Sequence, residues 1–131
     1  MDLNRSLSFF EAAGRMEADG EPFVVITLVH GKGHIPQEPG AKMIVARDGL
    51  RWGTVGGGKV EAKAIEKARE LLDRGFREPL YLTWNLTRDI GMTCGGELSY
   101  LFEPHGAQSW VVAVYGAGHV GQALTRLLAS N

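Results

Sequence analysis

The sequence predicts an α/β protein in which a mixed β-sheet is flanked by helices and followed by an incomplete Rossmann β-α unit. Three observations predict this class. Phe23 to Val29 is a continuous apolar and β-branched run, which is typical of a strand buried on both faces. Residues 59 to 74 carry apolar side chains at helical spacing. Near the C-terminus, a short apolar run leads through glycines into another helical pattern.

Composition and charge limit the functions open to the chain. Its 131 residues are 44% apolar and 22% charged, which suffices for an ordinary globular core. A net charge of −1, without a cluster of Lys and Arg, disfavours nucleic acid as a partner. The sequence shows neither a secretion signal nor an apolar run long enough to span a bilayer, so we expect a cytoplasmic protein with no membrane partner.

The first half of the chain is predicted to hold a helix, a strand and a hairpin. Apolar side chains recur at helical spacing over Leu3 to Ala18, and Asp19-Gly20 ends that pattern. After the strand Phe23 to Val29, a loop rich in glycine and proline precedes two further strands, Ala41 to Ala46 and Leu50 to Val55. A tight turn joins these two strands as a hairpin.

The next segment is predicted to complete a first domain over residues 1–103. Lys59 to Arg74 places alanine, valine and leucine on one face and charged side chains on the other, as in an amphipathic helix. Pro79 to Leu86 and Glu97 to Phe102 follow as strands. Thr87 to Gly96 is the polar loop that joins them.

Residues 104–109 are polar and rich in turn formers, which predicts a linker to a second segment, 110–131. There, Trp110 to Tyr115 is predicted as a strand and Gln122 to Ala129 as a helix. Between them stands the pattern G-x-G-x-x-G, formed by Gly116, Gly118 and Gly121.

A complete dinucleotide fold also needs a second strand and an acidic residue to hold the ribose, and the sequence ends at Asn131 before either. We therefore expect the truncated start of a Rossmann-like domain. A structural remnant is favoured over NAD(P) binding.

Gly56, Gly57 and Gly58 connect a predicted strand directly to the helix that starts near Lys59. Without Cβ atoms, backbone N–H groups can approach an anion closely, and the helix N-terminus adds its dipole. A phosphate fits this pattern. A tight strand-to-helix turn without a ligand explains the same residues equally well.

Cys94 is the only cysteine, so it cannot form an internal disulfide or a zinc site made of several thiolates. Gly95 and Gly96 give its thiol access, and access is one condition for a reactive thiolate. On these residues alone, a small buried thiol is the favoured interpretation. His30 and His34 are four residues apart, but the glycines around them argue against the helix that a metal site would need.

Three segments, in this order and spacing, resemble the XdhC/CoxI family of xanthine dehydrogenase accessory proteins. The segments are Gly40-Ala41-Lys42-Met43, then Gly53 to Glu61, then Cys94-Gly95-Gly96. The resemblance covers about residues 23 to 129 and extends into the Rossmann start at Gly116. It implies a chaperone rather than an enzyme: a protein that binds molybdenum cofactor, assists the sulfuration of the cofactor and passes it to a molybdenum hydroxylase.

Carried over by residue, the resemblance implies that Cys94 is the thiol near molybdenum or its transferred sulfur, with Gly95 and Gly96 beside it. It implies that Gly56 to Gly58 hold the anionic end of the pterin. These roles suit the preference of soft metals for sulfur and of phosphates for helix N-termini. The family usually has Gly-Ser-x-Pro-Arg in the first loop, whereas here His34 replaces the serine and Gln37 the arginine, which removes a hydroxyl and a cation.

The implied partners are a xanthine dehydrogenase-like client and a cysteine desulfurase that donates sulfur, and we expect a homo-oligomer such as a dimer. Two other functions stay open. One is a fragment of an NAD(P)- or nucleotide-binding oxidoreductase, on the evidence of Gly116 to Gly121. The other is a non-catalytic module that associates with itself through its last strand and helix.

Overall fold

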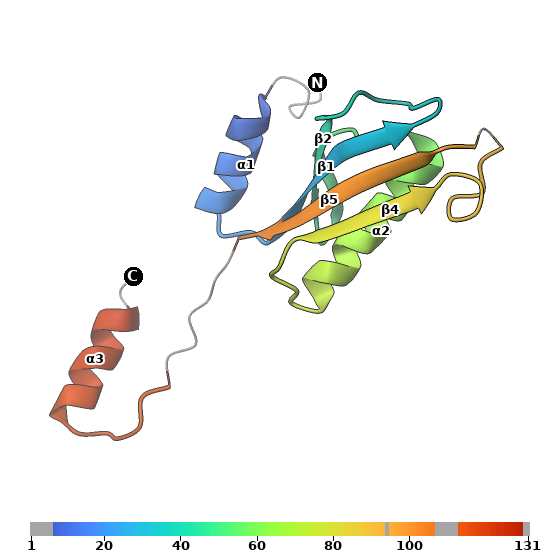
Figure 1. Cartoon of the computed structure of the whole chain (residues 1–131). Helices are drawn as coiled ribbons and strands as arrows, with labels where there is room; N and C mark the ends of the chain where they lie inside the picture. Colours follow the sequence, from blue (N-terminus) through green and yellow to red (C-terminus); the bar gives the residue numbers. More distant parts are fainter. Residues whose placement is uncertain (1–6, 94, 107–112, 130–131) are drawn as a thin grey trace.

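The computed structural model describes residues 7–93, 95–106 and 113–129. Groups of strands stand between its helices along the chain (Figure 1). They are α1 (Phe9–Ala18), β1 (Phe23–Lys32), β2 (Lys42–Ala46), β3 (Gly49–Gly53), α2 (Gly58–Asp73), β4 (Leu80–Asn85), β5 (Glu97–His105) and α3 (His119–Ala129).

The five strands form one sheet in the order β3-β2-β1-β5-β4, and each neighbouring pair is antiparallel. The predicted α/β class is confirmed, but strand direction alternates throughout instead of being mixed. The reason lies in the connections. β2 and β3 form a hairpin beside β1, while β5 returns from the far edge strand β4 and pairs with the other side of β1.

The central strand β1 supplies side chains to both faces of the sheet. Val24, Ile26 and Leu28 pack on the side of α2, whereas Phe23 and Val25 pack on the side of α1. All five are buried, which confirms the strand predicted as buried on both faces. Helix α2 covers one face of the sheet, and α1 covers part of the other (Figure 1).

Helix α1 begins at Phe9, so the predicted start at Leu3 is wrong for the part of that segment that the structure describes. Ser8 explains the boundary, because its hydroxyl accepts from the Glu11 N–H while the Glu11 carboxylate accepts from the Ser8 N–H at 2.7 Å. This reciprocal capping box fixes the first turn. Residues 1–6, including Leu3, lie outside the described ranges.

Two strands are longer than predicted. β1 continues past Val29 to Lys32, and β5 continues past Phe102 to His105. Each extension pairs with the predicted part of the other strand, since His105 pairs with Phe23 at one end and Lys32 pairs with Glu97 at the other. The first two residues assigned to the linker, Pro104 and His105, therefore lie within the sheet.

Beyond residue 112, the strand prediction for Trp110 to Tyr115 is wrong where the structure describes it, since Ala113 to Tyr115 are not in a strand. Within the described ranges these residues pair with no strand, and a strand needs a partner to satisfy its backbone. The helix starts at His119, and none of its described residues is buried. Within the described ranges, no helix has both the length and the apolarity needed to cross a membrane.

Candidate functional site

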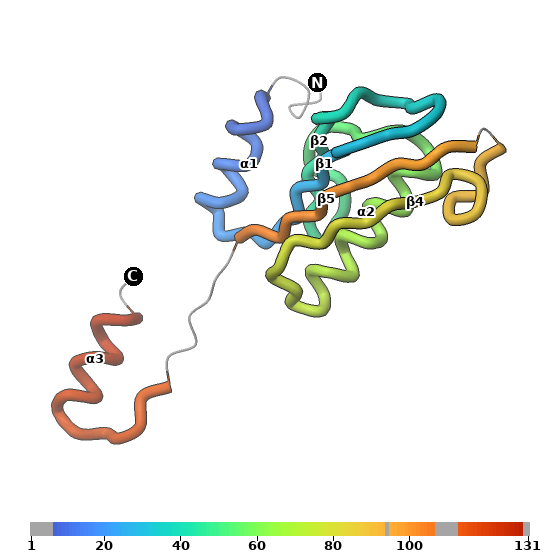
Figure 2. The backbone as a smooth tube through the Cα atoms, in the orientation of Figure 1, coloured from blue at the N-terminus to red at the C-terminus, as the bar shows by residue number. Residues whose placement is uncertain are grey.

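Three glycine-containing loops meet at one end of the sheet, as the chain trace in Figure 2 shows. They connect β1 to β2, β3 to α2, and β4 to β5. The strand register requires this arrangement, because Glu97 pairs with both Lys32 and Asn85, and Gly53 pairs with Met43. We call this end of the molecule the glycine-loop end. It brings Gly56–Gly58 and Gly95–Gly96 to the same region.

Close approaches at two glycines show that the three loops are in contact. A Cβ placed on Gly33 would lie 3.4 Å from the Gly96 Cα, and one on Gly56 would lie 3.6 Å from the Pro36 Cγ. The first loop therefore touches both of the others. His34 and Gln37 belong to this first loop.

Gly96 occupies a position that only glycine fits. Its φ of +122° is one that other residues rarely adopt, and a Cβ there would lie 2.6 Å from the Lys32 carbonyl oxygen. Gly95 also has a positive φ, of +53°. Cys94 itself lies outside the described residues, so its predicted role stays a prediction.

Gly57 and Gly58 leave the start of α2 open. No side chain caps this helix, and a Cβ on either glycine would meet no atom within 4 Å. Gly58 has a φ of +49°, while the φ of 166° at Gly57 is extended backbone. Uncapped N–H groups and the helix dipole together make a helix N-terminus attractive to anions. This geometry allows the phosphate interpretation and leaves room for the ligand.

Two lysines of α2 bind the loop between β4 and β5. The Lys59 ammonium donates to the Gly91 carbonyl oxygen at 3.2 Å, and that of Lys63 donates to the Asp89 carbonyl oxygen at 2.6 Å. Lys63 also stands over the Trp84 ring, 5.5 Å from its centroid. The helix that starts at the triple glycine is thus tied to the loop that leads to Gly95 and Gly96.

Asp89 organises the base of the same loop. Its carboxylate accepts from the Arg88 guanidinium and from the Asn85 N–H. The ionic hydrogen bond from Arg88, helped by the Asn85 N–H, lowers the pKa of Asp89 to about 2, and the positive charge of Lys63 contributes. Sequence reasoning missed Lys63 and Asp89. They are 26 residues apart, and no local pattern marks such a pair.

Two side-chain hydrogen bonds involve the segment just before Gly56. The Thr54 hydroxyl bonds the Glu61 carboxylate, and the buried Tyr100 hydroxyl donates to the Val55 carbonyl oxygen at 3.0 Å. Burial raises the pKa of Tyr100, and the negative charge of Glu61 raises it further. Tyr100 therefore stays neutral and anchors β5 to the segment just before Gly56.

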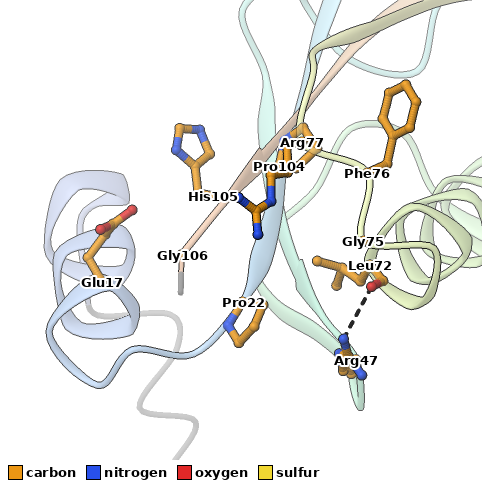
Figure 3. A pocket seen from close by; sticks show the side chains of 10 residues that line it. All are labelled: Glu17, Pro22, Arg47, Leu72, Gly75, Phe76, Arg77, Pro104, His105 and Gly106. Carbon is orange, nitrogen blue, oxygen red and sulfur yellow. Dashed lines mark hydrogen bonds between the residues drawn. The ribbon is translucent and has the colours of Figure 1, made fainter. Parts of the chain in front are cut away.

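A separate hollow of about 510 Å³ lies at the opposite end of the sheet (Figure 3). Its lining includes the side chains of Arg47, Arg77 and His105, and Arg47 donates to the Leu72 carbonyl oxygen at 3.2 Å. Gly106, which follows β5 in the sequence, also lines it. None of the residues that the sequence predicted for the site lies here.

The remaining predicted residues belong to the segment that carries α3. Gly116 has a φ of +115°, and a Cβ on Gly121 would lie 2.5 Å from the Gly116 carbonyl oxygen. Gly121 thus permits the close turn that precedes α3, while Gly118 meets nothing within 4 Å. The described structure does not bring these glycines to the glycine-loop end. Within its ranges it also contains no group of three or more His, Cys, Asp or Glu suited to a metal ion.

Comparison with known proteins identifies relatives of this chain. The model of the XdhC and CoxI family matches residues 16–82. The chain is 33% identical over 124 residues to the Escherichia coli protein YqeB, covering 92% of this chain and 22% of YqeB. It is 35% identical over 99 residues to the molybdenum cofactor insertion chaperone PaoD of Escherichia coli, covering 75% of this chain and 30% of PaoD. The chain thus spans less than a third of the length of these relatives.

Among solved structures, a Bacillus halodurans protein described as a xanthine dehydrogenase has a similar fold. The TM-score is 0.60, and the match covers 95% of this chain and 35% of that chain. At 23% sequence identity, this likeness concerns the fold alone.

Proposed function

Since the chain belongs to the XdhC and CoxI family, we propose that residues 7–106, which we call the sheet domain, bind molybdenum cofactor at the glycine-loop end and serve the insertion of that cofactor into a molybdenum hydroxylase. The observation that carries this proposal is the meeting of Gly56–Gly58 with Gly95–Gly96 at one end of the sheet. The two motifs are far apart in the sequence and share one region only in the fold. The name of PaoD, a molybdenum cofactor insertion chaperone, supports the same role.

The residues present suit the chemistry of the cofactor. Its phosphate would be held by the N–H groups of Gly57, Gly58 and the first turn of α2, where no side chain competes. Its molybdenum prefers soft sulfur ligands, and Cys94 is the one thiol in the sequence. When bound, the cofactor supplies the molybdenum centre of the client enzyme. The role that we propose for this chain is to bind and orient the cofactor.

We further propose a role for Cys94 in sulfur transfer and two partner proteins. The Cys94 thiol would lie near the molybdenum or its transferred sulfur, while a cysteine desulfurase supplies that sulfur. A xanthine dehydrogenase-like enzyme would then receive the cofactor. The chain spans only part of its relatives, so the contribution that we propose for this chain is the set of cofactor-facing loops.

Retention of molybdenum cofactor on a desalting column tests the proposal. We expect wild type to retain the cofactor, Cys94→Ala to lose it, and Gly57→Ala to retain at least about tenfold less. The Gly57 Cβ would enter open space at the helix start without strain, so it blocks the anion and leaves the fold intact.

Gly14→Ala is the matched control, because Gly14 lies in α1 and its Cβ would also meet nothing within 4 Å. The control should retain the cofactor like wild type. Equal retention by wild type and Cys94→Ala would remove Cys94 from the site. If Gly57→Ala retained as much cofactor as wild type, the start of α2 would not be part of the binding site.

A further inference from the structure

Glu61 places a carboxylate in the first turn of α2, beside the glycines that we propose to hold the phosphate of the cofactor. Its side chain is half-buried and bonds the Thr54 hydroxyl, which precedes the glycines in the sequence. Along the helix axis, Glu61 is only about 5 Å from Gly58. The carboxylate therefore lies within about one helical turn of the uncapped N–H groups.

The Thr54 hydroxyl fixes the position of this carboxylate. It accepts from the Gly56 N–H at 3.4 Å and donates to the Glu61 carboxylate. With its carboxylate bonded to Thr54, Glu61 does not cap α2, and the helix has no side-chain cap. The arrangement leaves the N–H groups free for a ligand and keeps a negative charge beside them.

The charge of Glu61 is not neutralised by a neighbouring cation. Within the described ranges Glu61 forms no ion pair. Lys59 and Lys63, the cations nearest to it in the sequence, donate instead to carbonyl oxygens of the β4–β5 loop. The charge also acts on its surroundings, because it adds to the effect of burial in raising the pKa of Tyr100.

A carboxylate in this position has opposite effects on the empty and the occupied helix start. In the empty protein, its charge interacts favourably with the helix dipole and stabilises the first turn. When an anion occupies the same N-terminus, the two negative charges repel each other. Their separation is shorter than the screening length of about 8 Å at physiological salt, so the repulsion is felt.

We propose that Glu61 limits how tightly the start of α2 holds the anionic end of the cofactor, and so allows the cofactor to leave for its client. This inference rests on the proposed function. A protein that serves cofactor insertion has to release what it binds, and an anion at an uncapped helix start with no opposing charge would leave slowly. Glu61 sets the rate of release without being a ligand of the cofactor, and Thr54 keeps its carboxylate from competing for the N–H groups.

Release of molybdenum cofactor from the loaded 131-residue chain during dialysis tests the proposal, with the molybdenum content of the protein as the readout. We expect Glu61→Gln to release the cofactor at least about fivefold more slowly than wild type at low salt. Glutamine keeps the shape of the side chain and a bond to Thr54 but removes the charge. The difference should shrink as added salt screens the repulsion.

Asp73→Asn is the matched control, because it removes the same charge from the far end of the same helix. Asp73 is about 18 Å further along the axis than Glu61, well beyond the screening length, so this variant should release the cofactor like wild type. A merely structural role of Glu61 predicts the opposite sign for Glu61→Gln. Loss of the favourable dipole interaction would then loosen the helix start and speed release.

Thr54→Val decides the question should circular dichroism show that Glu61→Gln does not fold. It frees the Glu61 carboxylate to compete for the N–H groups, so release should be at least about fivefold faster, and this excess should fall with added salt. Thr54→Ser, which keeps the hydroxyl, should behave like wild type.

The outcomes separate this inference from the proposed function. If wild type retains no cofactor at all, both are overturned. If wild type retains it and a folded Glu61→Gln releases it as fast or faster, only the role of Glu61 is overturned. Release from Thr54→Val at the wild-type rate, or a faster release that salt does not reduce, also overturns that role.

Discussion

At the scale of single residues, the glycines of the candidate site fall into two kinds. Gly96 is required by the fold, because its φ is positive and its Cα faces the Lys32 carbonyl oxygen. Gly57 is not, since its backbone is extended and its surroundings are open. Composition alone could not separate these kinds. The open surroundings of Gly57 instead leave room for a ligand that approaches the backbone.

Gly96→Ala is expected to lower the free energy of unfolding by about 2–4 kcal/mol, from backbone strain and collision with Lys32. Gly57→Ala should change it by less than about 1 kcal/mol. Urea unfolding followed by tryptophan fluorescence measures both. Equal effects of the two substitutions would contradict the distinction.

Asp89 predicts a dependence of stability on acid. Its pKa of about 2 in the fold lies below the ordinary value of 3.8, so its ionised form stabilises the native state. That contribution is present in full above about pH 5 and is lost as the pH falls through 4 towards 2. Asp89→Asn should therefore be less stable than wild type at pH 7, and the difference should shrink on acidification.

Urea midpoints of wild type and Asp89→Asn between pH 7 and pH 2 measure this difference. Asp73→Asn is a suitable control, because Asp73 is an exposed carboxylate at the end of α2. A difference that stays constant with pH would show that ionised Asp89 does not support the loop.

At the scale of elements, periodicity located each helix and strand of the sheet domain, with ends mostly within a few residues. The errors have local causes. Ser8 stops α1 short, and mutual pairing lengthens β1 and β5. Strand order could not be predicted, because β1 pairs with β5 across more than half the chain. The hydrogen bonds from Lys59 and Lys63 to the β4–β5 loop could not be predicted either, because each joins residues far apart in the sequence.

Ser8→Ala is expected to lower the free energy of unfolding by about 1 kcal/mol, the usual value of a helix N-cap. Gly14→Ala, in the same helix, should raise it by about 0.5–1 kcal/mol, because alanine favours the helix and has room here. Denaturant unfolding of the two variants measures the change in the free energy of unfolding in each. A neutral Ser8→Ala would mean that α1 does not depend on its capping box.

At the scale of the whole molecule, both hydrophobic clusters lie within residues 7–106. One packs between the sheet and α2, and the other between the sheet and α1. The described part of the segment with α3 adds no buried residue. The motif order in the sequence predicted the family, which the comparisons confirm, while the roles of Cys94 and of the Rossmann glycines stay predictions.

A chain ended after Gly106 should therefore unfold at nearly the same temperature as the full chain, within about 3 °C. The reason is that its core is already complete. Differential scanning calorimetry of the two forms measures this. A fall of 10 °C or more would show that residues 107–131 contribute to the stability of the sheet domain.

The pairing of Phe23 with His105 has a mechanical consequence. β1 begins and β5 ends at the same corner of the sheet, side by side and antiparallel, with the Phe23 and His105 rings stacked 5.4 Å apart. A force that pulls the N-terminal end of β1 away from the C-terminal end of β5 would break the backbone hydrogen bonds between the two strands one after another and not all together. The contact between Phe23 and His105 would break first. The pairing of Lys32 with Glu97, at the end that supports the glycine loops, would break last.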